Sequence, residues 1–145
     1  MGLDMKLSAT KYFSKNFNGK QAEQIKKVVK EITPESPVTV KFEVGYWRKA
    51  NHIHRWFVEN IQEGVDNCEN FYASREKLKE LLKVCKDVEA DHEKAKELLP
   101  ISTGFFFGGT EYEDWYFEDI HNTIDIIEKA LLLDISWDFE YHSSW

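Results

Sequence analysis

The amino-acid sequence predicts a single α+β domain, residues 1–145, in which about four helices pack on a small antiparallel or mixed sheet. Three segments of alternating apolar residues predict the strands, near residues 2–7, 38–44 and 135–142. The helical periodicities are grouped between these segments, unlike the regular alternation of a parallel α/β fold. Hydrophobic residues make up 42% of the 145 residues, and aromatic residues 14%, so the chain has enough apolar surface for one core.

The first third of the chain contains two strand signals and one helix signal. Apolar and polar residues alternate over 2–7, which predicts a short strand at the start. A helix is expected over 21–32, because apolar residues recur there at helical spacing. Pro34 ends this helix, since proline lacks the amide donor that a helix interior requires. The clearest alternation covers 38–44, and Gly45 is expected to stop that strand.

Helices predominate in the middle of the chain. The first is expected over 46–62, where a broad apolar stripe recurs at helical spacing. Ser74 is a suitable N-cap for a second helix over 75–88. A short third helix over 95–99 is expected to end before Pro100.

The last third begins with an aromatic run and ends with a strand. Residues 105–109, three Phe followed by two Gly, indicate a buried strand or a turn. Thr110 and Glu113 have the spacing of a capping box, in which each side chain accepts a hydrogen bond from a backbone amide at the helix start. The long helix that they open carries its apolar stripe as far as Leu131, and a strand over 135–142 follows.

Charge is distributed unevenly along the chain. Residues 1–56 contain 11 basic and 5 acidic residues, whereas residues 57–145 contain 8 basic and 21 acidic ones, for a net charge of −7. Nucleic-acid binding by the acidic part is disfavoured, because phosphate backbones require Lys and Arg. Five acids of the long helix are expected to face either solvent alone or a basic partner: Glu113, Asp114, Glu118, Asp125 and Glu128.

Several kinds of chemistry lack their motifs. His52 and His54 would point about 200° apart on a helix, so they cannot share a metal ion, and we expect no metal or cofactor. The sequence contains no serine-nucleophile motif and no phosphate-binding glycine loop. Cys68 and Cys85 cannot form a disulfide framework, which favours a reducing cytosol. No run of about 18 apolar residues predicts a membrane span, and the start lacks the pattern of a secretory signal.

Residues 46–57 combine two Trp, three basic residues, two His and one Asn. If they form a helix, Trp47, Asn51 and His54 share one half-buried face, where polar groups need hydrogen-bond partners. One interpretation is that these side chains bind backbone carbonyls under the sheet. The other is a pocket in which Trp stacks on a planar ring and a base meets an anion, as suits a nucleotide. The candidate ligand contacts are then Trp47, Arg48, Lys49, Asn51 and His54.

Short runs along almost the whole chain form a recognisable set. The most specific is Tyr46-Trp47-Arg48-Lys49-Ala50-Asn51, and the others are Met1–Met5, Ile53-His54, Trp56–Val58, Ser74–Glu76, Phe105–Gly108, Thr110–Tyr112, Trp115-Tyr116 and Ser143–Trp145. Together they resemble a widespread family of small uncharacterised proteins encoded by bacteriophages and prophages. Lys6 departs from this pattern, since an aromatic residue is more usual there. The resemblance implies an accessory phage protein that acts in the cytoplasm of the infected bacterial host, and it implies no assigned enzymatic activity.

Three functions are consistent with these observations. We favour a protein that binds and inhibits a host factor or defence system through its polarised surface, with a host or phage protein rather than nucleic acid as partner. The first alternative is a small-ligand or nucleotide-sequestering protein with a pocket around Trp47 to His54. The second is an enzyme with a nonstandard site that combines His54 with an acid such as Asp4. A binding protein is therefore expected rather than an enzyme.

Overall fold

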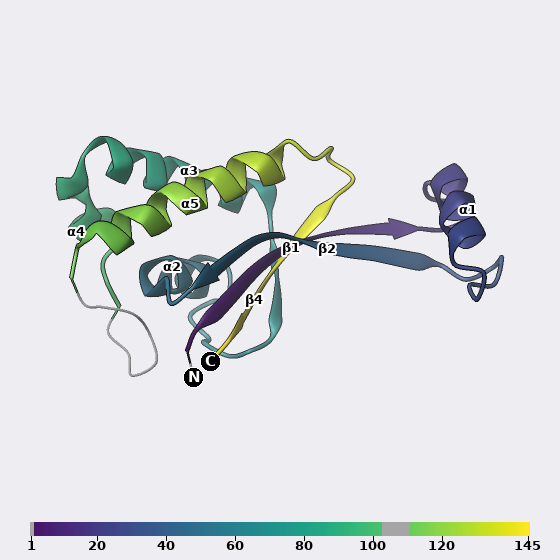
Figure 1. Ribbon diagram of the computed structural model, residues 1–145, viewed down its shortest axis with the longest axis horizontal. Coiled ribbons are helices and arrows are strands. Elements are labelled where there is room, and N and C mark those ends of the chain that lie inside the picture. The colour runs from purple at the N-terminus through teal and green to yellow at the C-terminus, as the bar shows by residue number, and fades with distance from the viewer. Residues whose placement is uncertain (1, 103–110) are drawn as a thin grey trace.

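The computed structural model describes residues 2–102 and 111–145. Its centre is one four-stranded sheet with the order β2-β1-β4-β3, in which each neighbouring pair is antiparallel (Figure 1). The strands are β1 (Asp4–Phe13), β2 (Val38–Arg48), β3 (Asn70–Ala73) and β4 (Asp138–Ser144). The predicted α+β class is confirmed, and the three predicted strand segments lie in the same antiparallel sheet.

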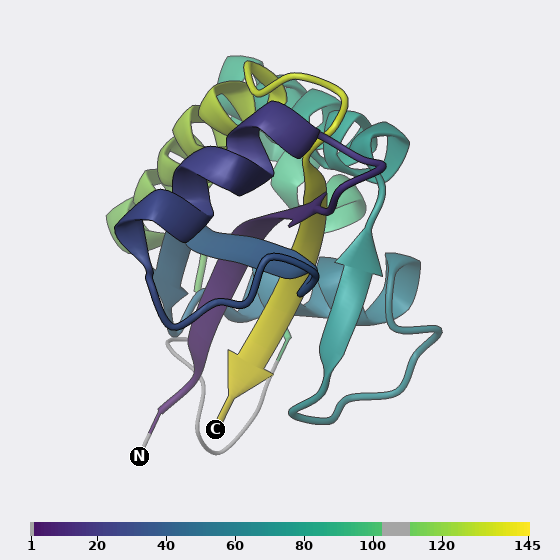
Figure 2. The ribbon, with the colours of Figure 1, turned by 90° about the vertical axis from the view of Figure 1, so that its right-hand side faces the viewer.

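The described residues form five α-helices: α1 (Gly19–Val28), α2 (Asn51–Asn60), α3 (Arg75–Ala90), α4 (Ala95–Leu98) and α5 (Asp114–Leu131). A 3-10 turn, η1 (His92–Lys94), precedes α4. In Figure 2, α2, α3 and α5 lie behind the sheet, so they cover one of its faces. Ser74 caps α3 as predicted, because its Oγ accepts a hydrogen bond from the Lys77 amide at 3.2 Å. None of the described helices is long and apolar enough to cross a membrane.

Alternation of apolar and polar residues explains why the helices cover one face. The inward-facing residues at the centre of β1 have no exposed surface: Met5, Leu7 and Ala9. On the opposite face, cross-strand ion pairs join Lys6 to Glu43 at 3.6 Å and Lys41 to Glu140 at 2.7 Å. Exposed ion pairs of this kind contribute little to stability. The sheet is therefore held mainly by burial of its inner face.

Aromatic rings join α2 to the sheet. Tyr141 of β4 stacks on Phe57 of α2, with ring centroids 3.9 Å apart and planes 6° apart. Trp47 of β2 meets the Phe57 ring edge-on at 5.9 Å. All three side chains are buried, so these contacts lock α2 against the sheet through packing rather than through charge.

An arm projects from the body of the molecule (Figure 1). Strand β1 pairs with β2 from Asp4↔Arg48 to Phe13↔Val38, but it pairs with β4 only as far as Thr10↔Asp138. Beyond that point β1 and β2 form a two-stranded ribbon with α1 at its far end. We call residues 11–40 the arm.

The helix predicted over 46–62 begins later than expected, at Asn51, because β2 continues through Gly45 to Arg48. A bulge at Val44 shifts the register, and Gly45 then pairs with Leu7 of β1. A Cβ on Gly45 would lie 2.2 Å from Cγ2 of Ile126, so the glycine permits α5 to approach the strand and does not end it. The apolar residues that were expected to form one stripe on a helix are therefore divided between β2 and α2.

Other boundaries also differ from the prediction. Strand β1 is longer than predicted, because its pairing with β2 continues into the arm as far as Phe13↔Val38. The four-residue strand β3 was not predicted. Strand β4 begins at Asp138, which leaves Ile135 87% exposed in the preceding turn. Helix α1 ends at Val28, and α5 begins at Asp114 with Glu113 as N-cap but no side-chain capping bond. The predicted strand or turn at 105–109, and Thr110 of the capping box, lie outside the described residues.

Replacing Gly45 with Ala is expected to lower the free energy of unfolding by about 1–3 kcal/mol, the usual effect of overpacking a core. The cause is the clash of the new Cβ with Ile126. Urea denaturation of wild type and variant measures the difference. Gly19→Ala is the control, since its Cβ would have its nearest neighbour, the Ser14 carbonyl oxygen, at 3.9 Å. Equal stability of Gly45→Ala and wild type would contradict this close approach.

Candidate functional site

Trp47, Asn51 and His54, which were expected to share one face of a helix, lie on two different elements of the structure. Trp47 lies on β2 and is 1% exposed, and its Nε1 donates a hydrogen bond to Thr123 Oγ1 at 2.8 Å. Its ring is part of the core and is not available to stack on a ligand. Arg48, next along β2, is exposed on the other side of the strand, and Lys49 lies in the turn that precedes α2 with φ 57°.

The other two candidates lie on α2 and are buried. The Asn51 side-chain amide donates to the Ser102 carbonyl oxygen at 2.7 Å. His54 Nε2 lies 2.9 Å from Asp66 Oδ1, and His54 Nδ1 lies 2.7 Å from the Tyr141 hydroxyl. Since Asp66 accepts, a neutral His54 ring donates from Nε2 and accepts the Tyr141 proton at Nδ1. The sequence interpretation that Asn51 binds a backbone carbonyl matches this geometry.

This arrangement constrains what His54 can do chemically. Burial lowers the pKa of His54 more than the nearby Asp66 raises it, so the ring is held neutral. Both ring nitrogens are engaged by protein groups, so the ring could not take a proton from a substrate without losing one of these bonds. Asp4, the acid considered as its partner, instead accepts a hydrogen bond from Tyr46. The predicted combination of His54 with Asp4 is therefore not formed.

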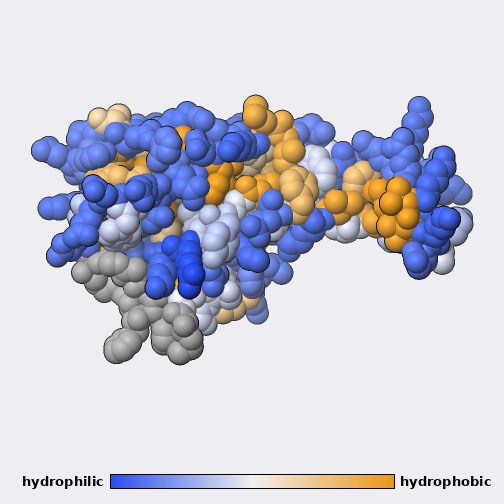
Figure 3. All heavy atoms as spheres, in the orientation of Figure 1, coloured by the Kyte–Doolittle hydropathy of each residue, from blue (hydrophilic) through white to orange (hydrophobic). Residues whose placement is uncertain are grey.

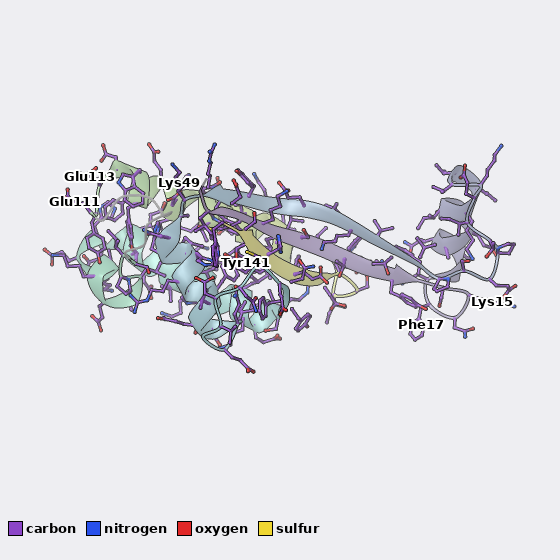
Figure 4. All side chains as sticks on the ribbon, turned by 90° about the horizontal axis from the view of Figure 1, so that it is seen from below. Lys15, Phe17, Lys49, Glu111, Glu113 and Tyr141 are labelled. Atoms are coloured by element: carbon purple, nitrogen blue, oxygen red, sulfur yellow. The ribbon has the colours of Figure 1, made fainter. Side chains whose placement is uncertain are left out.

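Figure 4 shows Tyr141 inside the body of the molecule. A cavity of about 380 Å³ lies beside the network that Tyr141 forms with His54, and Arg55, Asp66 and Ser102 are among its lining residues. Arg55 also donates to Glu59 at 2.8 Å. Within the part of the chain that the structure describes, no cluster of His, Cys, Asp and Glu could hold a metal ion.

The acidic residues chosen from the sequence, in contrast, largely converge. A groove of about 590 Å³ runs between α3 and α5, and four of the five acids line it: Glu113, Asp114, Glu118 and Asp125. Glu89 of α3 adds a further carboxylate. The fifth acid, Glu128, lies outside this groove and pairs with Lys86 of α3 at 2.6 Å.

Aromatic side chains form part of the surface between these acids. His92 of η1 stacks on Phe117 of α5, with centroids 3.7 Å apart and planes 14° apart. Tyr112 and Ile120 also line the groove. Acidic groups around a partly apolar surface are suited to a basic side chain with an apolar stem, which can be buried while its charge is paired.

The electrostatics of the groove are those of crowded carboxylates. The hydrogen bond and the charge of Glu111 raise the pKa of Glu113. Asp119, on the same helix but outside the groove, has its pKa raised to about 7 mainly by burial and further by the charge of Glu118. Among the described lining residues there is no Lys or Arg, and His121, whose pKa Glu89 and Asp125 raise, lies 2.8 Å from Glu89. The groove therefore has a negative potential that a cationic partner would relieve.

Two parts of this geometry were not predicted. The contact of Glu89 with His121 depends on the packing of α3 on α5, which the sequence does not indicate. The contact of His121 with Asp125 lies within one helix and follows from their spacing of four residues. Asp66, which holds His54, lies in the loop after α2, where no periodicity marks it.

Comparison with known proteins identifies no relative. No family model matches the chain, and neither a curated protein nor a solved structure matches it. The fold and the groove give the class: a small α+β protein with a projecting arm and an acidic groove.

The stability of the fold is expected to decrease as the pH falls from about 6.5, the ordinary pKa of histidine, towards 3. His52 is buried and stacked on Tyr116 at 4.1 Å, and burial lowers its pKa to about 3. Between these pH values His52 is protonated in the unfolded chain but neutral in the folded protein. The free energy of unfolding therefore falls by up to about 1.4 kcal/mol per pH unit because of this one group. Urea denaturation at several pH values measures it.

The His52→Phe variant, which keeps a ring but cannot titrate, should show a shallower decrease. The exposed His121, replaced in His121→Gln, is the matched control, because its pKa is raised rather than lowered. If His52→Phe followed the wild-type pH dependence, His52 would not be held neutral in the folded protein.

Replacing Tyr141 with Phe is expected to lower the free energy of unfolding by about 1–3 kcal/mol, because a buried nitrogen of His54 loses its hydrogen-bond donor. Thermal and urea denaturation measure the effect. Tyr72→Phe on the adjacent strand removes a hydroxyl from a side chain that is 65% exposed, and it should leave stability nearly unchanged. Equal effects of the two substitutions would show that the bond to His54 contributes nothing.

Proposed function

We propose that this protein acts by binding a partner protein through the acidic groove between α3 and α5, and that binding inhibits the partner. The observation that carries the proposal is the convergence of Glu113, Asp114, Glu118 and Asp125 with Glu89 on one concave, partly aromatic surface. Such a surface selects for positive charge and supplies apolar area to bury, which are the two features of a protein-binding site with charge specificity.

The chemistry of the groove indicates the chemistry of the partner. A helix or loop rich in Arg and Lys would meet the carboxylates, and an Arg guanidinium could stack on the ring of Phe117 or His92. Nucleic acid is disfavoured at this surface, because its phosphates would be repelled by the acids. A basic face of a host protein is therefore the partner that the groove supports best.

The biological setting of the proposal comes from the sequence resemblance to small phage and prophage proteins. A phage accessory protein in the bacterial cytoplasm that occupied a basic face of a host or defence protein would prevent that protein from using it. Inhibition by occupation needs no catalytic group, which is consistent with His54 being fully engaged by Asp66 and Tyr141.

The cavity of about 380 Å³ beside His54 supports a second candidate, the binding of a small ligand. The pocket would differ from the one expected, since Trp47 and Arg48 do not line it while Arg55 and Asp66 do. Ultraviolet absorbance and mass spectrometry of the supernatant after denaturation would detect a ligand carried by the purified protein.

Reversing the charge of two groove residues tests the main proposal. Glu118→Lys with Asp125→Lys should weaken binding to a bacterial partner at least about tenfold, and the wild-type affinity should fall as salt is added. The partner is isolated from bacterial lysate on immobilised wild-type protein, purified, and titrated by calorimetry at low and high salt. Both substituted residues are exposed, so stability should change little.

The control is Glu69→Lys with Glu97→Lys, which makes the same change in net charge at two exposed residues outside the groove. It should bind like wild type. Binding that survives reversal of Glu118 and Asp125, or that is independent of salt, contradicts the proposal.

A further inference from the structure

The arm carries positive charge that the rest of the molecule does not neutralise. It contains six Lys and three Glu, whereas residues 111–145 contain ten acids and one Lys. Among the described residues, none of the six lysines forms an ion pair. Figure 3 shows hydrophilic residues around α1 at the end of the arm. Four of the lysines are exposed: Lys15, Lys20, Lys27 and Lys30. The arm therefore has a positive potential that an anionic partner would neutralise.

Most of this charge surrounds one hollow of about 520 Å³, which we call the lysine hollow. Its lysines are Lys15, Lys26, Lys27 and Lys30. Lys15 comes from the turn after β1, and the other three come from α1 and the turn that follows it, so two separate segments contribute lysines to the same space. Two carboxylates, those of Glu23 and Glu35, also line the hollow. The lining thus keeps an excess of positive charge, as a site for phosphate groups requires.

Two exposed aromatic side chains lie near Lys15 at the tip of the arm. Phe17 is 65% exposed and Tyr12 is 51% exposed, and their rings meet edge-on with centroids 6.4 Å apart. A tight turn holds the pair, since Ser14 and Phe17 exchange two backbone hydrogen bonds, at 2.8 and 3.1 Å. Figure 4 shows Lys15 and Phe17 at the end of the arm, away from the body. Aromatic rings that are left in water on a hydrogen-bonded turn offer a surface on which planar groups can stack.

We propose that the arm binds single-stranded nucleic acid, with phosphates in the lysine hollow and bases on the rings of Tyr12 and Phe17. Lys15 belongs to both parts, because it lines the hollow and lies in the turn that presents Phe17. Lysines that track the backbone and aromatic rings that stack on bases are the combination by which proteins bind single strands. A duplex fits this surface less well, since its bases are stacked on one another. A lipid surface offers phosphates but no planar bases.

This inference does not depend on the proposed function. Figure 4 shows Lys15 and Phe17 at one end of the molecule and Glu113 of the acidic groove at the other, and the groove shares no lining residue with the lysine hollow. Salt screens exposed charges beyond about 8 Å at physiological ionic strength, so the acids of the groove do not cancel the potential of the arm. A strand on the arm leaves the groove open to its own partner.

Fluorescence anisotropy of a labelled oligo(dT) of about 16 nucleotides, titrated with the whole protein, tests the proposal. Lys27→Gln with Lys30→Gln should raise the dissociation constant at least about tenfold at low salt. It should also reduce the slope of log affinity against log salt by about 1.4, because each phosphate contact contributes about 0.7. Lys79→Gln with Lys96→Gln is the matched control, since both lysines are exposed on the body and form no ion pair within the described residues. It should bind like wild type.

Substitutions of Phe17 test the stacking separately from the charge. Phe17→Leu keeps an apolar side chain but removes the ring, and it should raise the dissociation constant at least about fivefold, the lower end of the effect of one stacked base. Phe17→Trp keeps a ring and should bind at least as tightly as wild type. The side chain is 65% exposed, so both variants should fold normally, which urea denaturation verifies. Equal binding by Phe17→Leu and wild type would contradict stacking on this ring.

Absence of oligo(dT) binding up to roughly 100 μM protein at physiological salt, the weak end of non-specific affinities, overturns the proposal. So does binding that the two pairs of lysine substitutions weaken equally, or tighter binding to a duplex of the same length. Sedimentation with vesicles of phosphatidylcholine and phosphatidylserine, without binding to oligo(dT), would assign the arm to a lipid surface instead. The groove variant Glu118→Lys with Asp125→Lys should bind oligo(dT) no more weakly than wild type, so a failure of partner binding and a failure of strand binding are distinguished.

Discussion

The unequal pairing of β1 on its two edges determines the shape of this molecule. On one edge β2 follows β1 from Asp4 to Phe13, and on the other β4 follows it only as far as Thr10. Where both neighbours are present, Met5, Leu7 and Ala9 lie under helices and are fully buried. Where β4 is missing, β1 and β2 continue as a two-stranded ribbon beyond α2, α3 and α5, and this ribbon with α1 is the arm (Figure 1). The body and the arm are therefore two consequences of one set of hydrogen bonds.

One-sided covering of the sheet then positions the helices that form the acidic groove. Helix α5 approaches β2 because Gly45 leaves room for Ile126, and α3 packs beside α5. With its apolar residues directed at the sheet, α5 presents Glu118 and Asp125 outward next to Glu89. The concentration of negative charge costs little, because the carboxylates remain in water, and it leaves a potential available for a partner.

The polar groups under the sheet have a different role. His54 joins α2 to the Tyr141 hydroxyl on β4 and to Asp66 in the following loop. Asn51, one turn earlier, joins α2 to the Ser102 carbonyl. Each bond satisfies a buried group that would be costly to leave unpaired, and each fixes the helix relative to a segment distant in sequence. Most of the residues predicted to contact a ligand therefore stabilise the packing of the body instead.

The sequence by itself determined the strand segments near the two ends, the clear strand before Gly45, the long acidic helix and the polarity of charge. These features depend on alternation, helical spacing and composition, which are local properties of the chain. The acids of the groove could be selected for the same reason, since their spacing on one helix follows from the apolar stripe opposite them. Tertiary structure alone decided that Trp47 belongs to a strand, because the choice rests on the pairing of Gly45 with Leu7 and on the approach of Ile126. It also decided that four residues from Asn70 form β3, which are too few for a periodic signal but pair with the free edge of β4. The partners of His54 and the meeting of Glu89 with His121 belong to the same group, since each joins residues that only packing of separate elements brings within hydrogen-bond distance.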